Sequence, residues 1–166
     1  IGDLVLRPYA SAYWNHNSNV LLEEENEQDD TSWALGYGID ALYGGAWLQV
    51  QARLWGLTER YQDVDMLDRD DFGDEIHVYM STAQDMTATL RHRYADVESV
   101  DYTIGEVERV RQHEIGGELA RPFTDRLNAS VSYDYRTQDY DSPSYFDWEQ
   151  QIARATVDYG VTDKSA

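Results

Sequence analysis

The stretch that decides the fold is residues 46–55, Ala-Trp-Leu-Gln-Val-Gln-Ala-Arg-Leu-Trp. On an extended chain its apolar and polar residues fall on opposite faces, the first set being Ala46, Leu48, Val50, Ala52 and Leu54 and the second Gln49, Gln51 and Arg53. Such period-2 alternation is typical of a β-strand with one buried or lipid-covered face. Residues 33–41, 127–136 and 153–161 repeat it, whereas helical spacing is hard to find.

The alternation extends over most of the 166 residues and predicts eight strands. We expect them at 4–20, 32–43, 46–61, 75–83, 87–98, 109–121, 127–138 and 149–161. Most are longer than the five or six residues common in soluble sheets. A tilted strand that crosses a bilayer needs roughly 9–11 residues. The strand lengths therefore favour a membrane-spanning sheet.

The predicted connections alternate between short and long. Short links fall at 44–45, 84–86 and 122–126, and long links at 21–31, 62–74, 99–108 and 139–148. This alternation is typical of an antiparallel up-and-down transmembrane β-barrel, with short periplasmic turns and long external loops. A single β-barrel domain over residues 1–166 is the predicted fold class.

Charge and aromatic residues follow the same division. Most of the 32 acidic residues lie in or beside the long links, and the net charge of −19 excludes a nucleic-acid partner. Aromatic residues stand at both ends of the strands, as in the girdles of membrane barrels, although aromatics also favour strands in general. They are Tyr43, Trp47 and Phe123 beside short turns, and Trp14, Trp33, Tyr61, Tyr94, Tyr135 and Trp148 nearer long links.

The polar face of the predicted strands would line the lumen of the barrel. Strand parity assigns to it Arg7, Asp40, Gln49, Gln51, Arg53, Asp134, Arg136, Arg154 and Asp158. We expect its arginines to meet acids such as Asp40, Glu59, Asp134 and Asp158.

Several segments resemble the outer-membrane beta-barrel porin family of the second type. The similar segments are the Asn-rich run 13–20, the arginine-and-proline turn 121–127, the tyrosine-rich strand end 133–141 and the closing stretch 158–164. The resemblance implies a bacterial outer-membrane pore or secretion channel of a Gram-negative cell, linked to exopolysaccharide transport. Family members are about twice this length, so it also implies the N-terminal portion of a longer barrel.

Two groups of residues suggest sharper chemistry. The acidic segment 63–75 offers hard oxygen ligands that could bind Ca²⁺, namely Asp65, Asp68, Asp70, Asp71 and Asp74, although its spacing is not that of an EF-hand. A solvated acidic loop is the alternative interpretation. The four histidines, His16, His77, His92 and His113, lie on separate predicted strands without metal-ligand spacing, which favours structural or lumenal roles.

No nucleophile motif or phosphate-binding glycine loop occurs, and we expect no enzyme; a pairing of His113 with Ser130 or Ser132 would be the only hint of one. No cofactor is expected other than Ca²⁺ at the acidic loops. Three functions stay open: an outer-membrane channel for a polysaccharide or small solutes, a structural or adhesive barrel with acidic external loops, and a soluble all-β calcium-binding module. For the first two, the partners would be the lipid bilayer and lipopolysaccharide.

An open eight-stranded sheet is untenable in lipid, so either the strand at 4–20 pairs with the strand at 149–161 or further strands join them, and we expect the second. Residues 163–166 resemble a turn leading to a further strand, and glycines beside arginines on the polar face suggest a lumen wider than that of an eight-stranded barrel. Further strands would then fill the gap between the first and last strands.

Overall fold

The computed structural model describes residues 2–20, 29–82, 85–101 and 106–160. Its eight strands are β1 (Asp3–Asn17), β2 (Asp30–Gly44), β3 (Leu48–Tyr61), β4 (Arg69–Ser81), β5 (Thr87–Asp101), β6 (Glu106–Thr124), β7 (Leu127–Tyr140) and β8 (Trp148–Tyr159). The one helical element of the described residues is the 3₁₀ helix η1 (Asp65–Leu67). Among them, no helix is long and apolar enough to cross a membrane.

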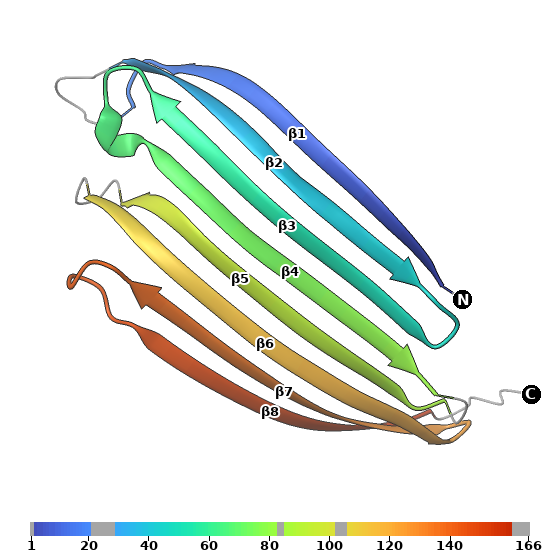
Figure 1. Cartoon of the computed structure of the whole chain (residues 1–166). Coiled ribbons are helices and arrows are strands. Elements are labelled where there is room, and N and C mark those ends of the chain that lie inside the picture. The colour runs from blue at the N-terminus through green and yellow to red at the C-terminus, as the bar shows by residue number, and fades with distance from the viewer. Residues whose placement is uncertain (1, 21–28, 83–84, 102–105, 161–166) are drawn as a thin grey trace, which may run out of the picture.

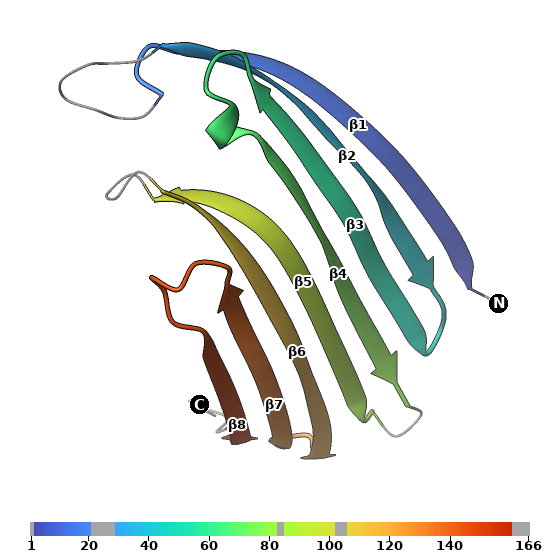
Figure 2. The same cartoon turned by 60° about the vertical axis from the view of Figure 1, so that its left-hand side comes forward.

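The strands form one sheet in the order β1 to β8, and each neighbouring pair is antiparallel. This confirms the predicted all-β, up-and-down arrangement of eight strands. Figures 1 and 2 show a single curved layer with β1 and β8 at its two edges. Within the described residues these two strands do not pair with each other, so the sheet is open.

Several predicted strand boundaries were wrong by three residues or more. β1 ends at Asn17 rather than at 20, and β5 ends at Asp101 rather than at 98. β4 begins at Arg69 rather than at 75, and β6 spans 106–124 rather than 109–121. Asp70, which was predicted to lie in a loop, is part of β4, because Arg60 on β3 neutralises it at 2.7 Å. Residues 21–28 and 102–105, which belong to two of the predicted long links, lie outside the described residues.

The hydrophobic core is confined to the end of the sheet that carries the long links. There Val20, Val64 and Leu67 are buried together, beside η1. Asp30, at the start of β2, joins this end to the segment after β3, because its carboxylate accepts hydrogen bonds from the backbone N–H groups of Gln62, Asp63 and Val64.

Most of the sheet is one layer thick, and many large apolar side chains on it are exposed. A single layer has no second layer of protein to cover such side chains. Its function must therefore be sought in what covers each of its two faces.

Candidate functional site: the two faces of the sheet

The polar face of the sheet carries all nine residues that the sequence assigned to a lumen. The strand register places Arg7, Asp40, Gln49, Gln51, Arg53, Asp134, Arg136, Arg154 and Asp158 on one and the same side. Most of the buried residues within strands also lie on this face, including Ser32, Glu59, Asp71, Glu108 and Asp134. Polar side chains are therefore crowded together here.

A row of alternating charge crosses this face from edge to edge. Residues paired directly from β1 to β8 are, in order, Arg7, Asp40, Arg53, Glu75, Arg93, Glu114, Arg136 and Gln150. Unlike charges directly opposite each other stabilise a sheet, whereas like charges destabilise it. Two ion pairs within this row join Arg53 to Asp40 at 2.8 Å and Arg136 to Glu114 at 3.1 Å. The charge row therefore also helps to specify the register.

Beside the charge row, Asp134 on β7 holds two arginines. Its carboxylate lies 2.7 Å from Arg91 on β5 and 3.3 Å from Arg154 on β8. To reach Arg91 it crosses Gly116 on β6, where an added Cβ would lie 2.2 Å from the carboxylate oxygen Oδ1. The missing side chain at Gly116 thus makes room for a bridge that spans four strands.

A second cluster lies near the long-link end of the face. The buried carboxylate of Glu59 accepts hydrogen bonds from Ser32 Oγ at 2.9 Å and from Arg69 Nε at 3.0 Å. Arg69 also approaches Asp71 at 3.8 Å. Glu59 therefore meets Arg69, and not one of the arginines expected from parity.

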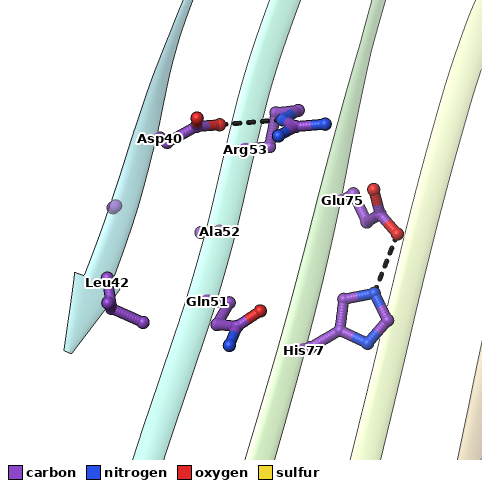
Figure 3. Close-up of a pocket in the computed structure, with 8 residues that line it drawn as sticks. Asp40, Leu42, Gln51, Ala52, Arg53, Glu75 and His77 are labelled. Carbon is purple, nitrogen blue, oxygen red and sulfur yellow. Dashed lines mark hydrogen bonds and ion pairs between the residues drawn. The ribbon is translucent and has the colours of Figure 1, made fainter. Parts of the chain in front are cut away.

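Figure 3 shows a shallow pocket beside the charge row, between β2, β3 and β4. Asp40 and Arg53 face it from one side, and Glu75 and His77, 2.8 Å apart, face it from the other. A polar hollow with both signs of charge suits water, ions or hydroxylated solutes rather than an apolar ligand.

Acids outnumber arginines among the described side chains of the polar face. Eleven carboxylates are set against seven arginines, the acids being Asp3, Asp30, Asp40, Glu59, Asp71, Glu75, Glu108, Glu114, Glu118, Asp134 and Asp158. The arginines are Arg7, Arg53, Arg69, Arg91, Arg93, Arg136 and Arg154. A face with this surplus attracts cations.

The opposite, apolar face is covered by exposed hydrophobic side chains. They include Leu4, Leu6, Leu54, Leu90, Ile115, Leu119, Val131 and Val157, each more than a third exposed. A continuous apolar surface over this many strands is far more than a soluble monomer normally leaves in water. It needs a partner or a lipid phase.

The upper limit of this apolar band lies towards the end of the sheet that carries the long links. Measured against the paired rows of the sheet, this limit descends from β1 towards β8. Aromatic residues mark it at Trp14 on β1 and at Tyr135 on β7. The β1 residue that shares a paired row with Tyr135 is Leu6, eight residues below Trp14. Over the six steps from β1 to β7 the limit therefore falls by roughly 1.3 residues per strand. Residues are about 3.4 Å apart along a strand and strands about 4.8 Å apart, so this slope corresponds to strands tilted by about 43° from the normal of the band.

The lower limit descends in the same direction. It is marked by Tyr43 on β2 and Tyr159 on β8, and Tyr159 lies six residues below Ala153, which shares the row of Tyr43. That slope is roughly one residue per strand, or a tilt of about 35°. Both tilts agree with the 35–45° of strands in transmembrane barrels.

The height of the band also fits a bilayer. Between the two limits β2 contributes residues 33–43 and β7 contributes residues 127–135, which are eleven and nine residues. A tilted transmembrane strand needs about 9–11 residues. The positions of the aromatic residues and the strand lengths are therefore both consistent with a sheet that crosses a bilayer with tilted strands.

One polar cluster interrupts the apolar face near its upper limit. Asp74 on β4, His92 on β5 and His113 on β6 all lie on this face, and Asp74 and His113 share a paired row with Tyr94. His92 Nδ1 lies 2.8 Å from an oxygen of Asp74, and His92 Nε2 lies 3.0 Å from His113 Nε2. This cluster could not be predicted from the sequence, because its members meet only through the register of three strands.

The other histidine expectations turn out differently. His77 lies on the polar face, whereas His92 and His113 do not. Ser130 and Ser132 lie on the polar face as well, so the register separates them from His113 and removes the one hint of a nucleophile and its base.

The five candidate calcium ligands are not gathered into one site. Asp71 points to the polar face, Asp70 and Asp74 lie on the apolar side, and Asp65 is in η1. Arg60 pairs with Asp70 and lies 3.7 Å from Asp68. Its hydrogen bond lowers the pKa of Asp70, which lies above the apolar band. Among the described residues, no group of three or more acidic or histidine side chains could hold a metal ion.

Comparison with family models, curated proteins and solved structures gave no significant match. The geometry of the two faces is therefore the basis for assigning a function.

Proposed function

We propose that this chain forms part of the wall of an outer-membrane channel, with its apolar face against lipid and its polar face towards an aqueous lumen. The tilted apolar band carries this proposal. Its two aromatic limits descend together across the sheet, and its height matches a bilayer. A soluble sheet that packs on another protein layer has no reason to place its apolar limits at a constant tilt.

The channel requires further strands that join β1 to β8. Both edge strands present unpaired backbone groups, and an open edge is untenable in the hydrocarbon region because no water is there to bond them. Within the described residues β1 and β8 do not pair, which supports closure by additional strands of the same alternating type.

The polar face supports passage of hydrated solutes. Its charge row and acidic surplus would make the lumen wet and selective for cations over anions. The family resemblance adds exported polysaccharide as a candidate solute, for which the pocket beside Arg53 offers charged and polar contacts.

Conductance of the whole protein, with the strands that close the sheet, in planar lipid bilayers tests the proposal. In a KCl gradient we expect a reversal potential with the sign of a cation-preferring channel. Arg53→Gln should shift it further towards cation preference, because Arg53 lies on the polar face. Arg111→Gln is the matched control, since Arg111 is also paired with an aspartate but lies on the opposite side of the sheet.

Two results would contradict the channel. Membrane insertion without conductance would indicate a structural or adhesive barrel with a plugged lumen. A monomer that is soluble without detergent would remove the membrane assignment and leave the soluble module.

A further inference from the structure

The cluster of Asp74, His92 and His113 has no role in the channel, since it lies on the apolar face. An ionisable cluster at such a place is costly, because neighbouring positions carry Ile76 and Ile115. Asp74 is 26% exposed and His92 34%, so the cluster is reachable from outside.

The two imidazole rings converge through the same atom. His92 Nε2 and His113 Nε2 are 3.0 Å apart, and the rings meet edge to face with centroids 5.0 Å apart. Two neutral Nε2 lone pairs cannot share this space, so either a proton or a cation must lie between them. A tetrahedral ion with bonds of 2.0–2.1 Å holds two nitrogens about 3.3 Å apart. The observed separation needs to open by only a few tenths of an ångström.

Asp74 prepares His92 for such a role. Its carboxylate oxygen lies 2.8 Å from His92 Nδ1, which places the proton of the neutral ring on Nδ1 and leaves the lone pair on Nε2. A carboxylate bound to the second nitrogen of a ligating histidine orients the ring and raises its basicity. The hydrogen bond thus selects the tautomer that ligates through Nε2.

We propose that His92 and His113 bind a divalent transition-metal ion of the Zn²⁺ class through their Nε2 atoms, with Asp74 positioning His92. Imidazole ligands suit Zn²⁺, Cu²⁺ and Ni²⁺ and not Ca²⁺. Two protein ligands leave the remaining coordination positions to water or to external oxygen ligands. Metal binding at this site does not depend on the proposed channel. If the sheet does span a membrane, the open coordination positions lie at the level of the lipid headgroups, and this placement alone rests on the proposed function.

Zn²⁺ titration of the full chain in detergent, with a chromogenic chelator as competitor, tests the proposal. We expect one Zn²⁺ bound per chain with an affinity that His92→Asn and His113→Asn each lower at least tenfold. Asp74→Asn should lower it about 10–100-fold, the usual loss when an outer-shell partner of a ligand is removed. His77→Asn is the control, because His77 also pairs with a carboxylate but lies on the polar face, and it should bind as the wild type does.

A second measurement avoids variants that fail to fold. Zn²⁺ should protect His92 and His113 of the wild type from diethylpyrocarbonate, while His77 remains reactive, as read by mass spectrometry. Zn²⁺ affinity unchanged in either histidine variant, binding unchanged in Asp74→Asn, or equal reactivity of all three histidines with and without Zn²⁺ would overturn the proposal.

Discussion

Adding one methyl group at Gly116 should break the bridge that Asp134 makes across the polar face. The new Cβ would lie 2.2 Å from Asp134 Oδ1 and 3.3 Å from Arg91 Nη2, so the carboxylate must move and lose its 2.7 Å contact with Arg91. Overpacking of this kind costs about 1–3 kcal/mol. Arg91 and Arg154 are 40% and 58% exposed, so water replaces part of the lost contact. Alanine in place of glycine in a strand regains about 0.5–1 kcal/mol, which leaves a net loss of about 0–2.5 kcal/mol for Gly116→Ala, centred at about 1 kcal/mol.

The assay is equilibrium unfolding in urea of the whole protein, with the strands that close the sheet, folded in lipid vesicles. Gly117→Ala is the matched control, because its Cβ would meet the end of the flexible, exposed Leu90 side chain at 3.1 Å and the Thr89 carbonyl oxygen at 3.4 Å, an ordinary van der Waals distance. We expect it to be neutral or slightly stabilising. In an Asp134→Ser background the cost of Gly116→Ala should fall to that of Gly117→Ala. Equal effects of the two alanines in the wild type, or strict additivity with Asp134→Ser, would refute this account of the bridge.

Three further predictions concern the faces and the rim. Leu90→Arg should lower the free energy of unfolding in bilayers by about 2–4 kcal/mol, because Leu90 lies near the middle of the apolar band. Thr89→Arg is the control on the polar face and should change this free energy by less than about 1 kcal/mol. Both are measured by urea unfolding. Asp30 lies above the band, where burial opposes its ionisation but hydrogen bonds from four backbone N–H groups outweigh burial and lower its pKa. Its ionised form therefore stabilises the fold above a pH of about 4, and this contribution is lost as the pH falls through the lowered value. Unfolding of Asp30→Asn should accordingly show a weaker pH dependence below about pH 4. In bilayers, the Arg53→Gln channel should be more cation-selective than the Arg111→Gln channel, as judged from reversal potentials.

The strands and their two faces could be predicted from the sequence because parity is a local property. Residues such as Gln51, Ala52 and Arg53 alternate along one strand, and only the strand itself is needed to assign them to faces. The short turns predicted three hairpins, β2–β3, β4–β5 and β6–β7, because two strands joined by a short turn pair with each other. The alternation of short and long links, typical of an up-and-down barrel, predicted the other pairs.

The start of β4 could not be predicted in this way. The density of carboxylates at Asp68, Asp70 and Asp71 indicated a loop, and their cation partners Arg60 and Arg69 are visible only once β3 and β4 are aligned. Local acidity is a poor guide where a strand continues beyond the apolar band and its carboxylates pair with arginines.

The cluster of Asp74, His92 and His113 could not be predicted from the sequence either. His92 and His113 are 21 residues apart and meet because β5 and β6 pair in one particular register. A shift of that register by one residue would place His113 on the polar face. Which residues contact each other across a sheet depends on the register of the paired strands. Which residues share a face of one strand depends only on the sequence of that strand.

The most direct test of the central claim is the depth of three positions that share one paired row of the sheet. Tyr43, Leu90 and Tyr133 lie in the same row, on β2, β5 and β7, and all are on the apolar face. The chain has no cysteine, so a single cysteine with a nitroxide label can be placed at each. In bilayers, oxygen and nickel-chelate accessibilities should place the label at Tyr43 near one interface, that at Leu90 near the midplane and that at Tyr133 near the opposite interface. Equal depths at the three positions, or labels that all meet water, would contradict a tilted sheet that spans the membrane.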